Sequence, residues 1–274
     1  MLTASDAAQR ILSFADGLPG PYGYERSIKF IGQQVYRDRF LVSFPKLALT
    51  LGANLDGLLE QLDFPAAGAP RLQGFLAEGD ILHLGFEGEA TAYVCKLYVE
   101  NAAHIRQLWA SASNEPDGAV RVHRALKWWS ENSSESSLLE TQYDWLPCAD
   151  RQALLHSIAN LWPTVPRKAL SDLLAVACRK VPAKDLQLLK VSEPDSIRNS
   201  FDLNLYDACL SLSDVQSILE AMLVDVGAER SNINAILLPL ADEALGHVAG
   251  GVARNGKLFL SLYFGVVERG RFNA

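Results

Sequence analysis

Residues 245–267 read LGHVAGGVARNGKLFLSLYFGVV, and this stretch decides the fold. Asn255 and Gly256 lie between two runs in which apolar and polar residues alternate. Asn-Gly favours a tight turn between antiparallel strands, because both residues readily adopt a positive φ. The stretch therefore predicts a hairpin with strands at 245–253 and 257–267.

Three similar pairs of strands precede this hairpin. Alternating and β-branched runs predict strands at 81–87 and 91–99, at 120–129 and 139–146, and at 186–191 and 200–207. Apolar residues at helical spacing predict helices at 102–113, 150–161, 167–180, 213–226 and 231–244. The order helix–helix–strand–strand recurs about every 60 residues, and such a period indicates a repeat architecture.

Residues 1–77 follow this pattern less clearly. Their apolar spacing predicts helices at 4–15 and 55–62 and one strand at 39–44, and it does not delimit a second strand. We therefore expect a single domain over 1–274, with regular repeats at 78–268 and a less regular N-terminal unit.

The polar faces of the predicted strands are unusual for a solvated sheet. One set of faces carries Leu97, Leu203, Leu205, Leu260 and Leu262, and the opposite set carries Lys96, Tyr98, Asn204, Tyr206, Ser261 and Tyr263. Rows of large rings exposed to water are costly, and a closed barrel removes that exposure together with the sheet edges. The predicted fold class is α+β: repeated α-α-β-β units forming an antiparallel β-barrel or strongly curved sheet with helices outside.

Composition excludes several classes of protein. The chain has 274 residues, with 25 Lys and Arg against 32 Asp and Glu, and this net charge of −7 argues against a nucleic-acid partner. No apolar run approaches the roughly 18 residues of a membrane span, and no basic segment precedes an apolar core at 1–20. Four widely spaced cysteines are typical of a reducing compartment. We expect a cytoplasmic protein that binds neither membrane nor nucleic acid.

Tandem α-α-β-β units closing an antiparallel barrel resemble the aromatic prenyltransferases of the ABBA, or PT-barrel, type. The resemblance covers about residues 78–268 by element order, and the segments 96–98 (KLY) and 260–263 (LSLY) are similar to inward Lys and Tyr positions of that family's strands. It implies a biosynthetic transferase that moves a prenyl group from an allylic diphosphate to a small aromatic or indolic acceptor in the lumen. The expected partners are these two small molecules.

This chemistry needs particular residue types. Cations stabilise a departing diphosphate, and the candidates are Lys96, Arg121, Lys127, Arg198 and Lys257. Aromatic faces stabilise the allylic carbocation, and the candidates are Tyr98, Tyr206 and Tyr263. A carboxylate, Glu87 or Glu100, can accept the proton lost when the acceptor regains aromaticity. His123, Asn204 and Ser261 complete the predicted substrate-binding set.

No cofactor or metal ligand is predicted. The sequence has no D-D-x-x-D segment, so magnesium is not indicated by a motif. His83, His123 and His247 fall on strands without the i, i+4 helical spacing of a metal pair, which favours structural histidines.

Two alternatives stay open. A non-catalytic or accessory barrel could bind an aromatic metabolite or a peptide in a biosynthetic pathway, and it is favoured if Asp202, Glu87 and Glu100 neutralise the inward cations. An open α+β sandwich could instead use its polar sheet face to bind another protein.

Overall fold

A computed structural model of the chain describes residues 2–88, 92–110, 118–130, 138–162, 164, 166–194 and 196–270. Within these residues, eleven strands form one antiparallel sheet. They are β1 (Tyr22–Ile31), β2 (Gln34–Tyr36), β3 (Arg39–Pro45), β4 (Ile81–Gly88), β5 (Tyr93–Glu100), β6 (Val120–Trp129), β7 (Leu139–Trp145), β8 (Leu188–Ser192), β9 (Asn199–Asn204), β10 (Leu245–Val252) and β11 (Leu258–Arg269).

The sheet closes into a barrel through its first and last strands. β1 pairs with β3 on one side and with β11 on the other, in a register that runs from Tyr22 opposite Arg269 to Ile31 opposite Phe259. Among the described strands, β2 pairs with β1 alone, so it extends the sheet without belonging to the ring. The predicted α+β barrel is confirmed, and the open sandwich is wrong.

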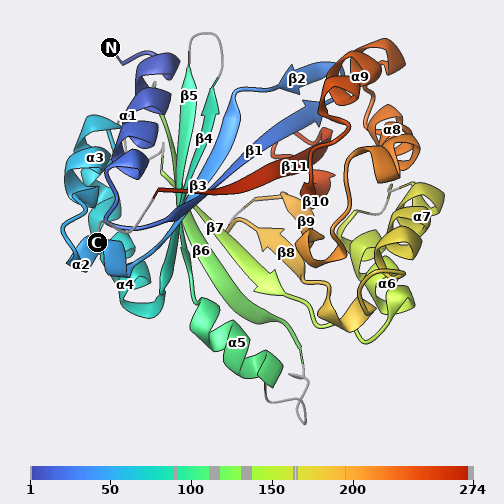
Figure 1. Ribbon diagram of the computed structural model, residues 1–274, viewed down its shortest axis with the longest axis horizontal. Helices are drawn as coiled ribbons and strands as arrows, with labels where there is room; N and C mark the ends of the chain where they lie inside the picture. The colour runs from blue at the N-terminus through green and yellow to red at the C-terminus, as the bar shows by residue number, and fades with distance from the viewer. Residues whose placement is uncertain are drawn as a thin grey trace.

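Helices cover the outside of the barrel in two groups, with α1 to α4 on one side and α6 to α9 on the other (Figure 1). The described helices are α1 (Ala4–Asp16), α2 (Leu47–Thr50), α3 (Leu55–Gln61), α4 (Ala69–Glu78), α5 (Ala102–Ala110), α6 (Arg151–Leu161), α7 (Arg167–Ala177), α8 (Gln216–Asp225) and α9 (Arg230–Leu237). Thr3, Asn54 and Asp150 cap the first turns of α1, α3 and α6 with side-chain oxygens. The segments 89–91, 111–117 and 131–137, which hold two predicted turns and the predicted end of a helix, lie outside the described residues.

The hydrophobic core lies between the barrel and these helices. Leu97 packs with residues of α1, α3 and α4, while Leu203 and Leu260 pack with residues of α6 to α9. All three leucines are fully buried, and burial of such a side chain stabilises the fold by about 1.5–3 kcal/mol. The predicted apolar faces are therefore the outer faces of the barrel, which leaves the polar faces for the lumen.

Two parts of the prediction need correction. The N-terminal unit does contain a hairpin, β1 and β3, although β1 was not predicted. The strand predicted at 200–207 ends at Asn204, and Tyr206 begins a short 3-10 turn, Tyr206–Ala208, because its backbone N–H is held by the Asn204 side chain at 3.1 Å. No helix in the described part of the chain is long and apolar enough to cross a membrane.

Candidate active site

The lumen contains two chambers of opposite charge. The basic chamber consists of adjoining cavities of about 30 and 190 Å³, both lined by Lys29, Lys127, Arg198 and Phe259. The acidic chamber has a volume of about 330 Å³. Three tyrosines and one aspartate line both the smaller basic cavity and the acidic chamber: Tyr98, Tyr143, Tyr263 and Asp202. These four residues mark the boundary between the two chambers.

The alternation of the strands produces this layering. On β5, every second residue points inward, so Lys96 reaches the basic chamber, Tyr98 the boundary and Glu100 the acidic chamber. β1 repeats the pattern, with Lys29 in the basic chamber and Glu25 in the acidic one. The basic chamber therefore lies at the end of the barrel where the hairpins turn.

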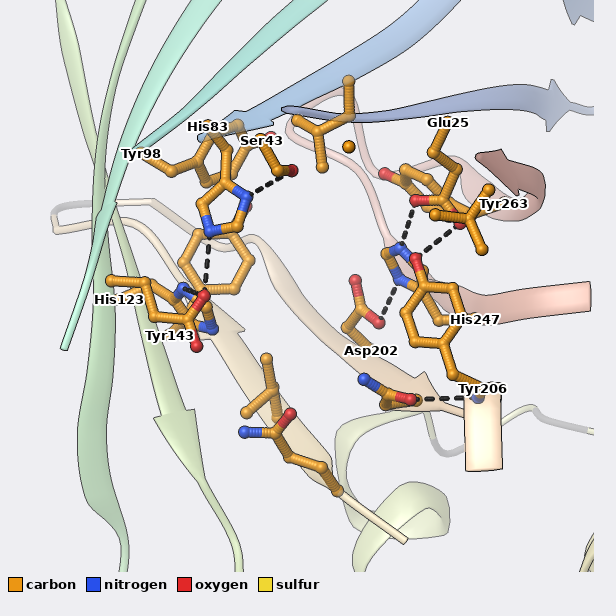
Figure 2. A pocket seen from close by; sticks show the side chains of 17 residues that line it. Glu25, Ser43, His83, Tyr98, His123, Tyr143, Asp202, Tyr206, His247 and Tyr263 are labelled. Atoms are coloured by element: carbon orange, nitrogen blue, oxygen red, sulfur yellow. Dashed lines mark hydrogen bonds and ion pairs between the residues drawn. The ribbon is translucent and has the colours of Figure 1, made fainter. Parts of the chain in front are cut away.

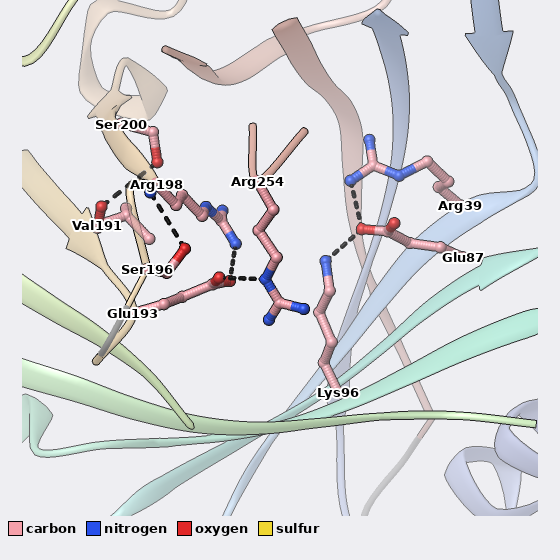
Figure 3. Close-up of polar contacts among 9 residues, drawn as sticks. All are labelled: Arg39, Glu87, Lys96, Val191, Glu193, Ser196, Arg198, Ser200 and Arg254. Atoms are coloured by element: carbon pink, nitrogen blue, oxygen red, sulfur yellow. Dashed lines mark hydrogen bonds and ion pairs between the residues drawn. The ribbon is translucent and has the colours of Figure 1, made fainter. Parts of the chain in front are cut away.

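Besides the boundary residue Asp202, six cations and two carboxylates line the basic chamber: Lys29, Arg39, Lys96, Lys127, Arg198, Arg254, Glu87 and Glu193. Each carboxylate holds two of the cations, as Figure 3 shows. Arg39 Nη2 donates to Glu87 Oε1 at 2.9 Å, and Lys96 pairs with the same oxygen. Glu193 pairs with both Arg198 and Arg254. Positive charge therefore exceeds negative charge in the chamber.

Several cationic groups keep unused donors. Among the described residues, neither Lys29 nor Lys127 forms an ion pair, and their ammonium groups lie 5.0 Å and 4.8 Å from the ring centres of Phe259 and Trp129. Within the same residues, the buried Nε and Nη1 atoms of Arg39 have no hydrogen-bond partner. A buried N–H without a partner is costly, so these donors favour an anionic ligand.

Burial shapes the ionisation of the basic chamber. Loss of hydration lowers the pKa of Lys29 to about 8 and holds the pKa of Lys127 well below its ordinary value. Burial alone would raise the pKa of Glu87, yet Arg39 and Lys96 hold it well below the usual range. The carboxylate is thus ionised, and an anion entering the chamber would favour the charged forms of both lysines.

The boundary is made of phenol rings. The Tyr98 and Tyr143 ring centres lie 5.6 Å apart, and the Arg39 guanidinium lies 5.7 Å from the centre of the Tyr263 ring. Burial raises the pKa of Tyr98 and of Tyr143 above the ordinary value, so both side chains are neutral at physiological pH. Ring faces that border both chambers can stabilise a cation that forms between them.

The acidic chamber contains two hydrogen-bonded histidine networks on opposite sides (Figure 2). In the first, His247 Nδ1 lies 2.7 Å from Asp202 Oδ1, and its Nε2 lies 3.1 Å from Glu25 Oε2. Tyr206 Oη donates to the other Glu25 oxygen at 2.5 Å. Burial opposes the charged form of His247, but Asp202 and Glu25 hold its pKa well above the ordinary value. A carboxylate oxygen beside each nitrogen favours the imidazolium form, and the ring stacks on Tyr263 with centres 3.9 Å apart.

Gly246 makes this first network possible. A Cβ atom at this position would lie 2.1 Å from a Glu25 carboxylate oxygen and 2.5 Å from the Tyr206 ring. Both distances are far below van der Waals contact, so the Glu25–Tyr206 hydrogen bond requires a glycine here.

The second network joins His83, Glu100 and His123. His83 Nε2 lies 2.8 Å from Glu100 Oε2, and His123 Nδ1 lies 3.6 Å from the same oxygen. Burial would raise the pKa of Glu100, but the histidines lower it to about 2, while burial lowers the pKa of His123 to about 4. Among the described residues that line the acidic chamber, none is Lys or Arg.

All but two of the predicted site residues line these chambers. Glu87, Lys96, Lys127, Arg198 and Ser261 lie in the basic chamber, Tyr98 and Tyr263 at the boundary, and Glu100, His123, Asn204 and Tyr206 in the acidic chamber. Arg121 is placed elsewhere because a register shift between it and His123 sets it opposite Asp144, with which it pairs. Lys257 is exposed in the turn before β11. In the part of the chain that the structure describes, neither residue lines one of the two chambers.

Sequence reasoning missed part of the basic chamber. Lys29 and Arg39 come from the N-terminal hairpin, of which β1 was not predicted, and Arg254 and Glu193 come from hairpin turns. The alternation of polar and apolar residues at 25–30 is a usable signal, since Glu25 and Lys29 point inward while Ile28 and Phe30 are buried outside.

Comparisons with known proteins match the structure but not the sequence. No protein-family model matches the chain, and no curated protein matches it. The structure of PriB in a binary complex with product diphosphate aligns with a TM-score of 0.59 and 14% identity, covering 96% of this chain and 91% of that one. The structure of 6-dimethylallyltryptophan synthase from Micromonospora olivasterospora, in complex with DMASPP and Trp, aligns at 0.56 and 15%, covering 97% and 98%. A further 6-dimethylallyl tryptophan synthase aligns at 0.51 and 14%, covering 96% and 97%.

At these identities the likeness shows the fold alone. The chain folds as the barrel expected from the PT-barrel resemblance, over nearly its whole length.

Proposed function

We propose that this protein transfers a prenyl group from an allylic diphosphate to a small aromatic acceptor inside the barrel. The observation that carries the proposal is the layering of the lumen: Tyr98, Tyr143 and Tyr263 separate a basic chamber from an acidic one. The reaction needs the same order of environments, since it passes a cation from an anionic leaving group to a neutral ring. The solved structures with product diphosphate and with DMASPP and Trp, each of the same fold, support this assignment.

In this proposal, the diphosphate binds in the basic chamber. The unpartnered nitrogens of Arg39 and the ammonium groups of Lys29 and Lys127 supply donors that no described carboxylate occupies. Glu87 and Glu193 keep the remaining cations in place before the ligand arrives, and such preorganised charge is what stabilises a developing anion. The bond between the allylic carbon and oxygen then breaks, and its electron pair leaves with the diphosphate.

The allylic carbocation forms at the tyrosine boundary. The neutral ring faces of Tyr98, Tyr143 and Tyr263 stabilise it by cation–π attraction and keep water away. A π electron pair of the acceptor ring forms the new carbon–carbon bond, and the ring carbon then loses its proton.

Asp202 is the proton acceptor that this geometry favours. Among the described carboxylates it alone lines both the acidic chamber and the smaller basic cavity, so it lies at the boundary where the bond forms. Glu87, one of the two predicted bases, lies in the basic chamber in contact with Arg39 and Lys96, and we assign it the positioning of those cations. Glu100, the other predicted base, lies between two histidines in the acidic chamber.

The acidic chamber also limits the size and the charge of the acceptor. Its volume of about 330 Å³ lies at the lower end of the roughly 300–1,000 Å³ of ligand pockets, which favours a ring system of one or two rings. The carboxylates Glu25, Glu100 and Asp202 line it without a described Lys or Arg, so a free carboxylate on the acceptor would be repelled. We propose a neutral or cationic acceptor, such as an indole or an aromatic amine.

The non-catalytic alternative is supported by the pairing of Arg39 and Lys96 with Glu87. Under that alternative, the carboxylates would neutralise the inward cations. Two buried lysines without an ion pair among the described residues weigh against it.

Turnover assays test the proposal directly. The purified protein is incubated with dimethylallyl, geranyl or farnesyl diphosphate and a panel that includes indole, tryptamine and tryptophan, and prenylated products are detected by mass spectrometry. We expect product with indole or tryptamine, and less with tryptophan. Lys96→Ala should abolish most turnover, while Lys257→Ala, which removes an exposed lysine, should not. No product with any pair would support the binding protein instead.

A further inference from the structure

Three adjacent strands bring two histidines and a glutamate together in the acidic chamber. His83 lies on β4, Glu100 on β5 and His123 on β6. Glu100 is directly opposite His123 in the β5–β6 register, and His83 is opposite Tyr98, two residues before Glu100 on the same face. Directly opposite and diagonal neighbours on one face of a sheet are close enough to share a ligand.

The three side chains present one ligand atom each to a common point. One nitrogen of each histidine and one Glu100 oxygen all lie within 4.8 Å of one another. Their side chains are only 14–18% exposed. Atoms bound about 2.1 Å from one ion lie roughly 3–3.5 Å apart, and the observed 2.8 Å and 3.6 Å from Glu100 Oε2 fall on either side of that range. Small rotations of the side chains would suffice to form a site.

A further contact orients the first histidine. Ser43 Oγ lies 2.7 Å from His83 Nδ1, which engages that nitrogen and leaves Nε2 directed at Glu100. Metal-bound histidines commonly use their second nitrogen in this way, because the bond fixes the tautomer and the plane of the ring. The serine comes from β3, so four consecutive strands contribute to the cluster.

We propose that His83, Glu100 and His123 bind a divalent transition-metal ion, with Zn²⁺ the best match. Imidazole nitrogens with one carboxylate oxygen suit zinc better than magnesium, which prefers oxygen ligands. Three protein ligands leave at least one coordination position free, and this position faces the acidic chamber. The site therefore takes an ion together with water or with a heteroatom of the bound acceptor, and it leaves Asp202 as the proton acceptor.

His247 shows why the other network is not a second such site. Both of its nitrogens are already bound to carboxylates on opposite sides of the ring, Asp202 and Glu25. The imidazole ring therefore separates Glu25 from Asp202. The two carboxylates and His247 cannot all bind the same metal ion.

Metal titration tests the proposal without depending on prenyl transfer. Untagged, chelator-treated protein is titrated with Zn²⁺ by calorimetry and with Co²⁺ by visible absorption. We expect one ion per chain and the visible bands of Co²⁺ bound by nitrogen and oxygen. His83→Ala, Glu100→Gln and His123→Ala should each weaken Zn²⁺ binding at least a hundred-fold.

Matched controls separate this site from binding at the surface. His104→Asn and His156→Asn remove exposed histidines and should leave the affinity and stoichiometry unchanged. Ser43→Ala keeps all three ligands and should weaken binding about ten-fold, a milder change that guards against loss of folding in the ligand variants. Absence of one-to-one binding by the unaltered protein, or equal affinity in the folded ligand variants, would overturn the site even if prenyl transfer is observed.

Discussion

The basic and acidic chambers share strands of the barrel, but their charged side chains are paired differently. On β5 a step of two residues leads from Lys96 to Tyr98, and another leads to Glu100. In the basic chamber, two carboxylates bind four of the cations and leave Lys29 and Lys127 without an ion pair among the described residues. In the acidic chamber, every carboxylate contacts a histidine. The charge that remains after internal pairing therefore indicates the ligand of each chamber, an anion in one and a neutral or cationic group in the other.

The largest expected effect concerns the buried ion pair of the basic chamber. Arg39→Met should destabilise the protein by about 3–5 kcal/mol, because Glu87 would lose one of the cations that hold its charge in a buried site. Chemical denaturation measures the loss, and Arg37→Met, at an exposed position nearby, should change stability little. Equal stability of the two variants would mean that Lys96 alone holds Glu87.

The second largest effect concerns ligand affinity, which should depend more on the basic chamber than on the tyrosine boundary. Lys96→Ala should weaken binding of a thiodiphosphate analogue about ten- to a hundred-fold, since a charge-assisted hydrogen bond contributes roughly 1.5–3 kcal/mol. Tyr98→Phe removes a neutral hydroxyl and keeps the ring, so its effect should be about five-fold at most. Calorimetric titration measures both, with Lys257→Ala as the matched lysine outside the chambers. A greater loss in Tyr98→Phe would place the diphosphate elsewhere.

The acidic chamber can be disturbed through its backbone. Gly246→Ala should cost about 1–3 kcal/mol of stability, because the added methyl group would overlap the Glu25 carboxylate and the Tyr206 ring. Gly74→Ala is the matched control: nothing lies within 4 Å of its Cβ position on α4, so it should stabilise by about 0.4–1 kcal/mol. Thermal unfolding compares the two variants, and a neutral Gly246→Ala would show that the Glu25–Tyr206 contact is dispensable.

The smallest effect is a pH dependence that belongs to the basic chamber alone. Burial lowers the pKa of Lys29 to about 8, so the lysine is protonated below this pH and neutral above it in the free protein. Diphosphate affinity should therefore fall as the pH rises through about 8, by up to ten-fold per unit for this lysine, because binding then requires uptake of a proton. Lys29→Arg, which stays charged, should flatten this part of the profile. Calorimetry in buffers of different ionisation enthalpy counts the protons taken up.

The sequence was sufficient for the strands of the four later hairpins because alternation and the Asn255-Gly256 turn are local signals, whereas closure of the ring depends on β1 and was expected only from the polar faces of the strands. It placed Lys96, Tyr98 and Tyr263 in the lumen for the same reason. Arg121 lies outside both chambers, beside a register shift that sets it opposite Asp144, and such a shift leaves no reliable mark in residue order.

The sequence did not predict which residues face each other on neighbouring strands. The cluster of His83, Glu100 and His123 depends on which residues face each other across β4, β5 and β6, and helical spacing rules say nothing about such pairs. The histidines were therefore interpreted as structural. Lys29 was missed for another reason. The strand β1 was not predicted, so the sequence analysis could not assign Lys29 to the inner or the outer face of a strand.

Closure of the sheet by β1 and β11 also has a consequence during protein synthesis. Tyr22 pairs with Arg269, so the first strand of the ring acquires its second neighbour only after β11 has been synthesised. Until then β1 has an unpaired edge, and such edges readily pair with other chains. A ring joined by its two most distant strands should also close slowly, since contacts between remote segments limit folding rates. We therefore expect the N-terminal hairpin to be exposed to pairing with other chains while the polypeptide is growing.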